Sequence, residues 1–163
     1  MTTVLIAYGS KMGGTAGIAQ QVADTLAERG CDVTLSPPAR AAGRYDAAVV
    51  GSALYAGRWR SEAVRALKRL AKDPPRHVWL FHSGPLGDGA DEPQALPKKV
   101  ALLAERVGAR DVVTFGGRLV EETASGWIAR AMIRNGKGGD FRDLDGVAAW
   151  AHAIGDEIGA PSA

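Results

Sequence analysis

Apolar runs and helical patterns alternate along the chain. Val4–Ala7 is a continuous apolar run, typical of a strand buried on both faces of a parallel sheet, and Ala47–Val50 has the same character. Pro37-Pro38 ends a shorter run, and Asp73-Pro74-Pro75 ends a helical pattern. We predict five strands, at Val4–Tyr8, Cys31–Leu35, Ala47–Ser52, His77–Phe81 and Asp111–Phe115.

Between the strands, apolar residues recur at helical spacing. Ile18, Val22 and Leu26 share one face of a predicted helix. This helix begins at Ala16 and ends at Gly30, because glycine favours a C-terminal cap. Further helices are predicted from stripes that begin at Ser61, Val100, Trp127 and Val147, and segment 38–44 has room for little more than one helical turn.

Strands that alternate with helices over short connections form a parallel sheet with helices on both faces. We therefore predict a single α/β domain over residues 1–163, doubly wound in three layers, with its five strands in the order 2-1-3-4-5. Ligands of such sheets bind beyond the C-terminal ends of the strands, where the winding reverses. Three predicted loops meet at that edge, namely residues 9–15, 52–60 and 82–91.

Composition narrows the classes of function. The formal net charge of +2 is too small to indicate nucleic-acid binding, and no basic run carries interleaved aromatic residues. The single cysteine, Cys31, excludes an internal disulfide and a multi-cysteine metal site, and we expect a buried structural thiol. No signal peptide is evident, and no segment reaches the roughly 20 apolar residues that cross a bilayer. We expect a cytoplasmic protein, and the sequence leaves its oligomeric state open.

The first loop, Gly9–Thr15, joins a buried strand to a helix N-terminus, a junction that attracts anions. It lacks the lysine directly before Thr15 that a nucleotide P-loop requires, and its glycines do not follow the dinucleotide spacing. The hydroxyls of Ser10 and Thr15, with the backbone amides around Gly13 and Gly14, suit one terminal phosphate. A plain strand–helix turn is the alternative interpretation.

The other two loops complete a pocket for a planar ring. Tyr55 and Trp59 stand among small residues in the second loop and could flank such a ring. The glycine-rich third loop can bring its backbone close to the ring edge. Together with a phosphate site, these features suit a mononucleotide with a large flat ring. His82 lies beside this pocket, and we favour a structural role for it over proton transfer; no catalytic side chain is assigned and no metal-ligand spacing is present.

Several stretches carry a resemblance to a known family. The loop Gly9-Ser-Lys-Met-Gly-Gly-Thr15 resembles the flavodoxin phosphate loop, which holds the phosphate of FMN. Within that superfamily the chain is similar to the menaquinone-dependent protoporphyrinogen oxidases of flavodoxin fold. The resemblance covers nearly the whole chain. The matching stretches are Ala48–Arg60, Leu80–Ser83, Phe115–Leu119 and Gly138–Arg142, with Trp150-Ala151 in the final helix.

The resemblance implies a flavodoxin-like fold with FMN at the three loops. Met12 replaces a threonine of flavodoxins, which removes one hydroxyl, and Lys11 is a candidate electrostatic substitute. The implied cofactor-binding residues are Ser10, Lys11, Met12, Gly13, Gly14, Thr15, Ala53, Leu54, Tyr55, Ala56, Gly57, Trp59, Ser83, Gly84, Pro85, Gly87 and Asp88. Among them, Tyr55, Gly57 and Trp59 would line one side of the isoalloxazine, and Ser83, Gly84 and Gly87 the other.

The implied activity is that of an FMN-dependent oxidoreductase that passes electrons from an organic substrate to a quinone-type acceptor. Glu121 and Glu122 stand where the protoporphyrinogen oxidases tend to have Tyr and Arg, which weakens the case for a porphyrin substrate. The alternative is a flavodoxin-type electron carrier without its own substrate. Such carriers are usually strongly acidic, so a net charge of +2 argues against that class. A deazaflavin donor or acceptor stays open, and a protein that has lost its flavin is the third alternative.

Residues 123–137 include a basic amphipathic segment. Trp127 and Met132 share its apolar face, while Arg130 and Arg134 lie elsewhere and Lys137 follows. Such a helix can rest on an anionic membrane, where a quinone is found, with about 1 kcal/mol from each basic residue. A weak peripheral contact is one interpretation, and packing of the apolar face on its own domain is the favoured alternative.

Overall fold

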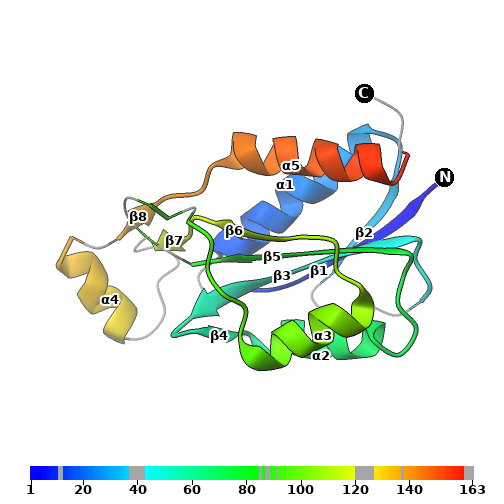
Figure 1. Ribbon diagram of the computed structural model, residues 1–163. Helices are drawn as coiled ribbons and strands as arrows, with labels where there is room; N and C mark the ends of the chain where they lie inside the picture. The colour runs from blue at the N-terminus through cyan, green and yellow to red at the C-terminus, as the bar shows by residue number, and fades with distance from the viewer. Residues whose placement is uncertain are drawn as a thin grey trace.

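Two helical layers cover a parallel sheet in the computed structural model, which describes residues 1–10, 13–36, 43–84, 86, 89–90, 92–119, 127–136 and 138–159 (Figure 1). The parallel strands are β1 (Thr3–Gly9), β2 (Asp32–Ser36), β3 (Ala47–Tyr55), β5 (His77–Ser83) and β6 (Val112–Phe115), paired in the order β2-β1-β3-β5-β6. In chain order these five strands follow the predicted 2-1-3-4-5, so the α/β doubly wound fold is confirmed. The sheet departs from the prediction in one element, the two-residue β4 (Arg58–Trp59), which pairs antiparallel with β3.

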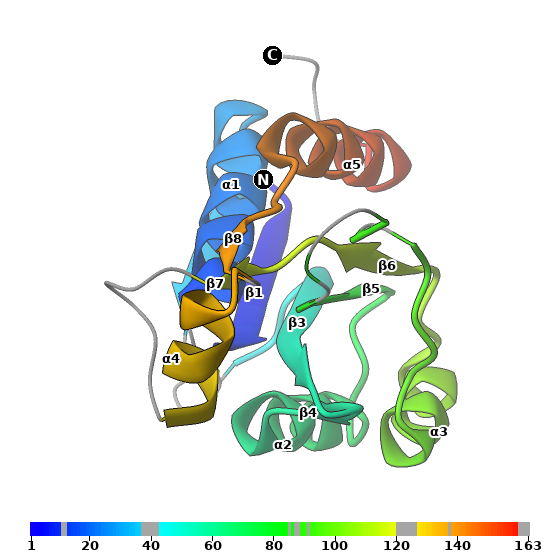
Figure 2. The ribbon, with the colours of Figure 1, turned by 90° about the vertical axis from the view of Figure 1, so that its left-hand side faces the viewer.

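The helices divide between the two faces of the sheet. Figure 2 shows α1 (Gly14–Glu28) and α5 (Leu144–Glu157) on one face, with α2 (Ser61–Leu70) and α3 (Lys98–Val107) on the other. Successive strand residues point to opposite faces, so each central strand supplies both cores. In β3 and β5, Val49, Trp79 and Phe81 pack toward α1 and α5, whereas Val50, Val78 and Leu80 pack toward α2 and α3.

An aromatic cluster joins α5 to the sheet. The ring of Trp150 lies edge-on to Phe81 and Phe115, with ring centroids 5.9 and 5.5 Å apart. A side chain at Gly51 would collide with the Phe81 ring, so glycine at that position of β3 leaves room for the cluster. Edge-to-face aromatic pairs contribute about 0.5–1.5 kcal/mol beyond the burial of their area.

Two predicted helix ends are confirmed. The amides of Gly30 and Cys31 donate to the carbonyls of Ala27 and Leu26, at 2.9 and 3.1 Å, and Gly30 has φ +84°. This is a Schellman motif, which glycine adopts without a steric penalty. Gly108 ends α3 in the same left-handed region. Cys31 is buried beside the α1 core as expected, and burial raises the pKa of its thiol.

Strands β3 and β5 run further than predicted. Ala53–Tyr55 continue β3 and then turn back into β4 through Ala56 and Gly57, whose φ angles of +50° and +72° fit a two-residue hairpin turn. His82 and Ser83 belong to β5 rather than to the following loop. The sequence predicts loops for these segments because Gly51-Ser52 and His82-Ser83 interrupt the apolar runs that indicate buried strands.

A further unit follows β6. The short strands β7 (Arg118–Leu119) and β8 (Gly139–Asp140) pair antiparallel and form a two-stranded ribbon that the sequence did not predict. Helix α4 (Trp127–Arg134) lies between them in sequence and stands apart from the sheet in Figure 2. Among the helices of the described ranges, none combines the length and apolar character that crossing a membrane requires.

A buried chain of hydrogen bonds links β4, β5 and β6. Trp59 Nε1 donates to His82 Nδ1 at 3.1 Å, and His82 Nε2 lies 2.9 Å from Thr114 Oγ1. Because Nδ1 accepts, the neutral ring carries its proton on Nε2 and donates it to Thr114. The amide of Gln94 also donates to Thr114 Oγ1, at 3.0 Å. His82 has no exposed surface and both its ring nitrogens are hydrogen-bonded, which fits the structural role expected from the sequence.

Protonation of His82 would oppose this arrangement. Burial lowers the pKa of His82 below its ordinary value of 6.5. A proton on Nδ1 would also face the Trp59 N–H, which is itself a donor. The unfolded chain therefore binds this proton more readily than the folded chain, and below about pH 6.5 that difference reduces stability.

We expect His82→Gln to lower the free energy of unfolding by about 2–4 kcal/mol, because it leaves the buried Trp59 and Thr114 groups poorly paired. The stability of the unmodified chain should fall between about pH 7.5 and pH 5.5, and that of the variant should fall less. Denaturant titrations across this pH range measure both effects. His152→Gln, at an exposed position of α5, is the control. A pH dependence unchanged by His82→Gln would contradict the assignment.

Candidate functional site

The start of α1 lies at the edge where β1 ends. A helix leaves its first four N–H groups without intrahelical partners, and these groups are usually capped by a side chain. Within the described residues, no side chain caps α1, because its N-cap residue is Gly13, at φ +81°, and its first turn contains no acidic residue. Gly14 and Thr15 are nonetheless buried. By contrast, Asp143 caps α5 by accepting from the amide of Gly146 at 2.9 Å. The start of α1 is therefore a site where an anion would satisfy the backbone.

Hydroxyl groups surround this helix start. Ser10 Oγ accepts from the amide of Gly13 at 3.2 Å, which shapes the turn into α1. Thr15 Oγ1 and Ser83 Oγ form a buried hydrogen bond of 2.8 Å. The structure thus brings together residues from the first and third predicted loops. Since the Thr15 and Ser83 hydroxyls bond each other, their immediate role is to attach α1 to the end of β5.

Glycines allow backbone segments to pack closely behind this pair. A Cβ at Gly84 would collide with the carbonyl oxygen of Leu54, and one at Gly117 would lie 2.8 Å from Gly84 Cα. A Cβ at Gly116 would collide with the carbonyl of Phe141. The chain segments that follow β5, β6 and β8 therefore converge at one edge, and a side chain at any of these glycines would push them apart.

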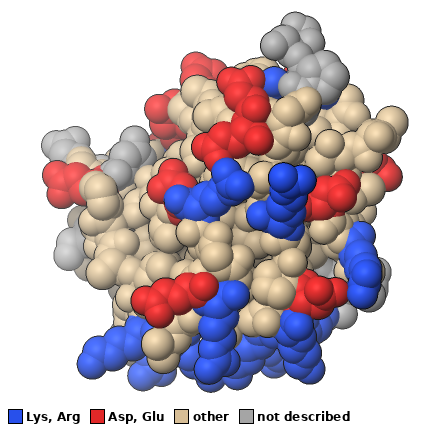
Figure 3. Space-filling view, turned by 45° about the vertical axis from the view of Figure 1, so that its right-hand side comes forward, with Lys and Arg blue, Asp and Glu red and all other residues tan. Residues whose placement is uncertain are grey.

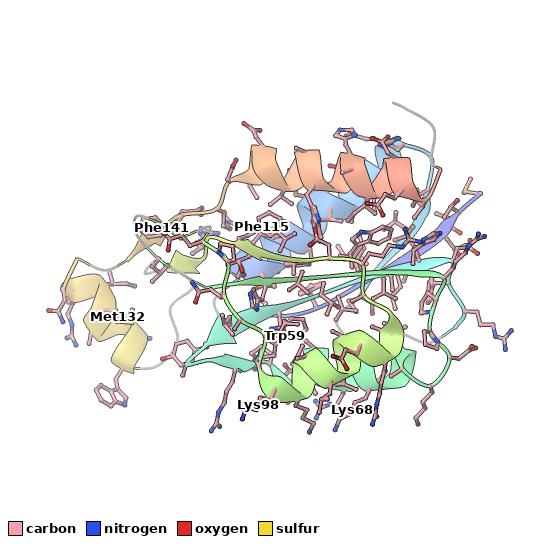
Figure 4. All side chains as sticks on the ribbon, in the orientation of Figure 1. Trp59, Lys68, Lys98, Phe115, Met132 and Phe141 are labelled. Carbon is pink, nitrogen blue, oxygen red and sulfur yellow. The ribbon has the colours of Figure 1, made fainter. Side chains whose placement is uncertain are left out.

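An ion pair within the segment of β8 orients Arg142 toward α1. Arg142 Nε and Nη2 donate to the two carboxylate oxygens of Asp140, at 2.9 and 2.7 Å. These bonds lower the pKa of Asp140 and raise the pKa of Arg142. The guanidinium of Arg142 also lies against Gly17, in the first turns of α1, where a Cβ would collide with it. Figure 4 labels Phe141, which lies in this region near Phe115.

Arg118 lies directly over the helix start. A Cβ at Gly14 would be 3.2 Å from both the Cβ and the backbone nitrogen of Arg118. Arg118 Nε is 3.8 Å from Asp140, too far for a hydrogen bond, and it has no hydrogen-bond partner. Because Arg142 already engages both oxygens of Asp140, these three side chains together leave one positive charge at the start of α1.

The hairpin of β3 and β4 forms another part of this edge. Tyr55 and Arg58 are exposed there, and a hollow of about 420 Å³ is lined by residues of the hairpin and the start of α2. Ala56, at φ +50°, is a non-glycine residue in a conformation that side chains rarely adopt. The two-residue turn between β3 and β4 requires this conformation.

Trp59 requires a correction. The sequence placed its ring beside a cofactor, but the side chain is only 7% exposed and packs in the core next to α2 and α3. Figure 4 shows it between the sheet and these helices. Its indole nitrogen is bonded to His82, so Trp59 anchors the hairpin and does not present its face to the open edge.

Five of the cofactor-binding residues predicted from the sequence lie outside the described ranges, and their roles stay predictions. Three candidates were overlooked, although two of the resembling stretches contain them. Their signal is a pair of glycines followed by charge, at Gly116-Gly117-Arg118 and Gly138-Gly139-Asp140. The overlooked residues are Arg118, Asp140 and Arg142, and the residues outside the described ranges are Lys11, Met12, Pro85, Gly87 and Asp88.

A second hollow, of about 450 Å³, opens near the starts of β1 and β3, at the opposite edge of the sheet. It is lined by Leu5, Tyr45 and Asp46 together with the end of α2.

Within the described ranges, no group of three or more His, Cys, Asp and Glu side chains is arranged to hold a metal ion. The C-terminal edge therefore remains the candidate site.

Several solved structures share the fold of this chain. A flavodoxin from the domain Archaea is 12% identical, with a TM-score of 0.66, and the match covers 96% of this chain and 99% of that one. Flavodoxin 2 from Bacillus cereus is 18% identical, with a TM-score of 0.59 and coverages of 95% and 99%. Rubredoxin oxygen:oxidoreductase from Desulfovibrio gigas is 17% identical with a TM-score of 0.58. Its match covers 98% of this chain but only 38% of the longer protein.

The comparison with curated proteins finds no match. The model of the flavodoxin domain family matches residues 5–139, which include β1, α1, the β3–β4 hairpin, β5 and β7. The uncapped start of α1 thus lies within the matched region. The chain belongs to the flavodoxin domain family, an FMN-binding electron-transfer fold.

Proposed function

We propose that this protein is an FMN-dependent oxidoreductase that passes electrons from an organic donor to a quinone-type acceptor. The observation that carries the site is the buried, uncapped start of α1 with an additional positive charge above it. The finer assignment, to a protein similar to menaquinone-dependent protoporphyrinogen oxidases, is supported by the stretches Ala48–Arg60, Phe115–Leu119 and Gly138–Arg142. The last two of these build the ribbon beside α1.

The residues present fit the phosphate of FMN. The donors at the start of α1 are backbone amides and the hydroxyl of Ser10, and the backbone and Cβ of Arg118 lie beside Gly14. Amides, a hydroxyl and a guanidinium all suit a phosphate oxygen. No described acidic side chain in the first turn of α1 would repel that group. The glycines behind the Thr15–Ser83 pair keep the neighbouring backbone close to this edge.

Each part of the edge then has a defined task. FMN, when bound, supplies the redox chemistry by accepting and releasing electrons. The amides of α1 would bind its phosphate, and Arg118 would balance the charge. Tyr55, exposed on the β3–β4 hairpin, would contact the ring system and limit access of water. The Trp59–His82 bond holds this hairpin against the core.

Charge distinguishes an enzyme from a simple carrier. Electron carriers of this fold are usually acidic, because a negative surface steers them toward basic partners. This chain has 20 basic and 18 acidic residues, a formal charge of +2. An uncharged quinone is not steered by surface charge, so a quinone-reducing enzyme needs no acidic surface. The alternative is an electron carrier without its own substrate, and a turnover experiment distinguishes it from the enzyme.

The proposed acceptor also raises the question of contact with a membrane. Trp127 of α4 is 77% exposed and Arg130 and Arg134 are exposed, whereas Ala131 and Met132 are half-buried. Part of the apolar face is thus covered by the protein, whereas the N-terminal end of α4, with Trp127, is exposed to solvent. Figure 4 shows Met132 on this helix, away from the sheet. We propose a weak peripheral contact by residues 123–137, of which 123–126 and 137 lie outside the described ranges.

Recognition of the phosphate predicts a large difference between FMN and riboflavin. Each hydrogen bond to a charged group contributes about 1.5–3 kcal/mol, and riboflavin lacks the phosphate. We expect FMN to bind at least about 100-fold more tightly, as measured by quenching of flavin fluorescence on titration with the protein. Equal affinities would contradict a phosphate site at α1, and no binding of either flavin would refute the proposed function.

The charge of Arg118 yields a second prediction. Arg118→Ala should weaken FMN binding about 10-fold, because a charge-assisted contact is lost, while riboflavin binding stays nearly unchanged. Arg118→Lys should restore part of the affinity and keep its dependence on salt. Arg130→Ala removes an exposed arginine from α4 and serves as the matched control. Equal losses for FMN and riboflavin would instead indicate that Arg118 only supports the packing of β7.

Turnover separates the two functional classes. With bound FMN, the protein should oxidise protoporphyrinogen continuously when a soluble menaquinone analogue is the acceptor, followed by porphyrin fluorescence. The same preparation without the quinone is the control. Efficient reduction of a cytochrome, with no oxidation of protoporphyrinogen, would support the carrier and contradict the enzyme.

A further inference from the structure

The outer faces of α2 and α3 carry an excess of positive charge. Figure 3 shows Lys and Arg side chains gathered along the lower margin of the molecule, where these two helices lie. None of six exposed cations there forms an ion pair with a carboxylate of the described residues, whereas Arg60 at the start of α2 does, as do Arg29, Arg44, Arg110 and Arg142 elsewhere. We call the six the cationic face: Arg65 and Lys68 of α2, Lys72 just after α2, and Lys98, Lys99 and Arg106 of α3.

Two features of the cationic face oppose folding rather than assist it. Lys98 and Lys99 occupy the first turn of α3, where the helix dipole disfavours cations, and Pro97 provides no side-chain cap. Lys68 of α2 approaches Lys99, and the neighbouring positive charge lowers the pKa of Lys68. Figure 4 shows Lys68 and Lys98 pointing away from the sheet. Charges that conflict with local stability indicate a role outside folding.

Exposed apolar side chains accompany this charge. Leu102 of α3 is 62% exposed and lies one helical turn from both Lys98 and Lys99 and from Arg106. The first turn of α4, which begins at Trp127, is at the same height as α2 in both ribbon views (Figures 1 and 2). A single surface could therefore touch the cationic face, Leu102 and the open end of α4.

The composition favours a lipid surface over a protein. Stable protein interfaces are enriched in aromatic residues and depleted in lysine, whereas the cationic face has four lysines and no aromatic residue. Single-stranded nucleic acid also requires aromatic stacking platforms. An anionic bilayer needs only basic side chains over a broad area with occasional apolar contacts. Two helices of ten residues each supply such an area.

We propose that the α2–α3 cationic face docks this protein on an anionic lipid bilayer, with Leu102 as an apolar contact at its centre. This inference does not rest on FMN, since it uses none of the residues at the start of α1. It also differs from contact through α4 alone, because the charged surface lies mainly on α2 and α3. Docking is electrostatic and reversible, and salt weakens it.

Vesicle binding tests the proposal. The full chain should co-sediment with phosphatidylcholine vesicles that contain about 30% phosphatidylglycerol, but not with pure phosphatidylcholine, and about 0.5 M salt should abolish binding. Each basic residue at the surface contributes about fivefold in affinity, so Lys68→Gln/Lys99→Gln should weaken binding about 30-fold. Because this variant removes a repulsive contact, its melting temperature should not fall.

Arg130→Gln/Arg134→Gln removes the same charge from α4 and is the matched control; because α4 makes only a weak contact, we expect it to weaken binding clearly less than Lys68→Gln/Lys99→Gln does. Equal losses in the two double variants would assign binding to net charge or to α4 and overturn the proposal. Absence of binding to the anionic vesicles would also overturn it, as would binding to polyglutamate or duplex DNA without binding to vesicles.

Discussion

The unsatisfied amides at the start of α1 are the constraint on which the candidate site depends. Gly13 has no side chain with which to cap them, and Ser10 accepts only from Gly13 itself. The absence of a side chain at Gly14 has a second effect, because it lets the backbone of Arg118 approach the helix. Gly13 thus leaves the first amides open to an anion, and Gly14 admits Arg118 beside them. A capping side chain at Gly13 would satisfy the helix internally and remove the reason for an anionic ligand.

The end of β5 holds the two layers of the protein around that helix start. His82 and Ser83 are consecutive and point to opposite faces of the sheet. Ser83 bonds Thr15 of α1 on one face, and His82 bonds Trp59 and Thr114 on the other. Because Ser83 pairs with Ala53 and Ser52 pairs with Gly9, the three central strands end almost level. This register explains why the start of α1 and the β3–β4 hairpin lie at the same edge of the sheet.

Periodicity in the sequence was sufficient for the fold but not for the details of the site. Buried strands and amphipathic helices have apolar patterns that need no knowledge of distant residues, so the sheet order could be inferred. The bond from Trp59 to His82 joins residues 23 positions apart and leaves no local signal, which is why Trp59 resembled an exposed ring. The two-residue strands β4, β7 and β8 are too short for any periodic signal. Arg118 was overlooked because its importance arises from contact with Gly14, which only the folded chain creates.

Topology also connects the cationic face with the candidate site. In a parallel sheet, each helix begins at the edge where the preceding strand ends, so Lys98 and Lys99 lie near the end of β5. The net charge of +2 does not reveal the cationic face, because a total charge does not show where the charges lie on the surface. If the cationic face rests on a bilayer, the β3–β4 hairpin with Tyr55 lies on the lipid side of the sheet, whereas the start of α1 lies on the other side (Figure 1). A quinone dissolved in that bilayer could then approach the flavin edge directly, and no acidic steering surface would be needed.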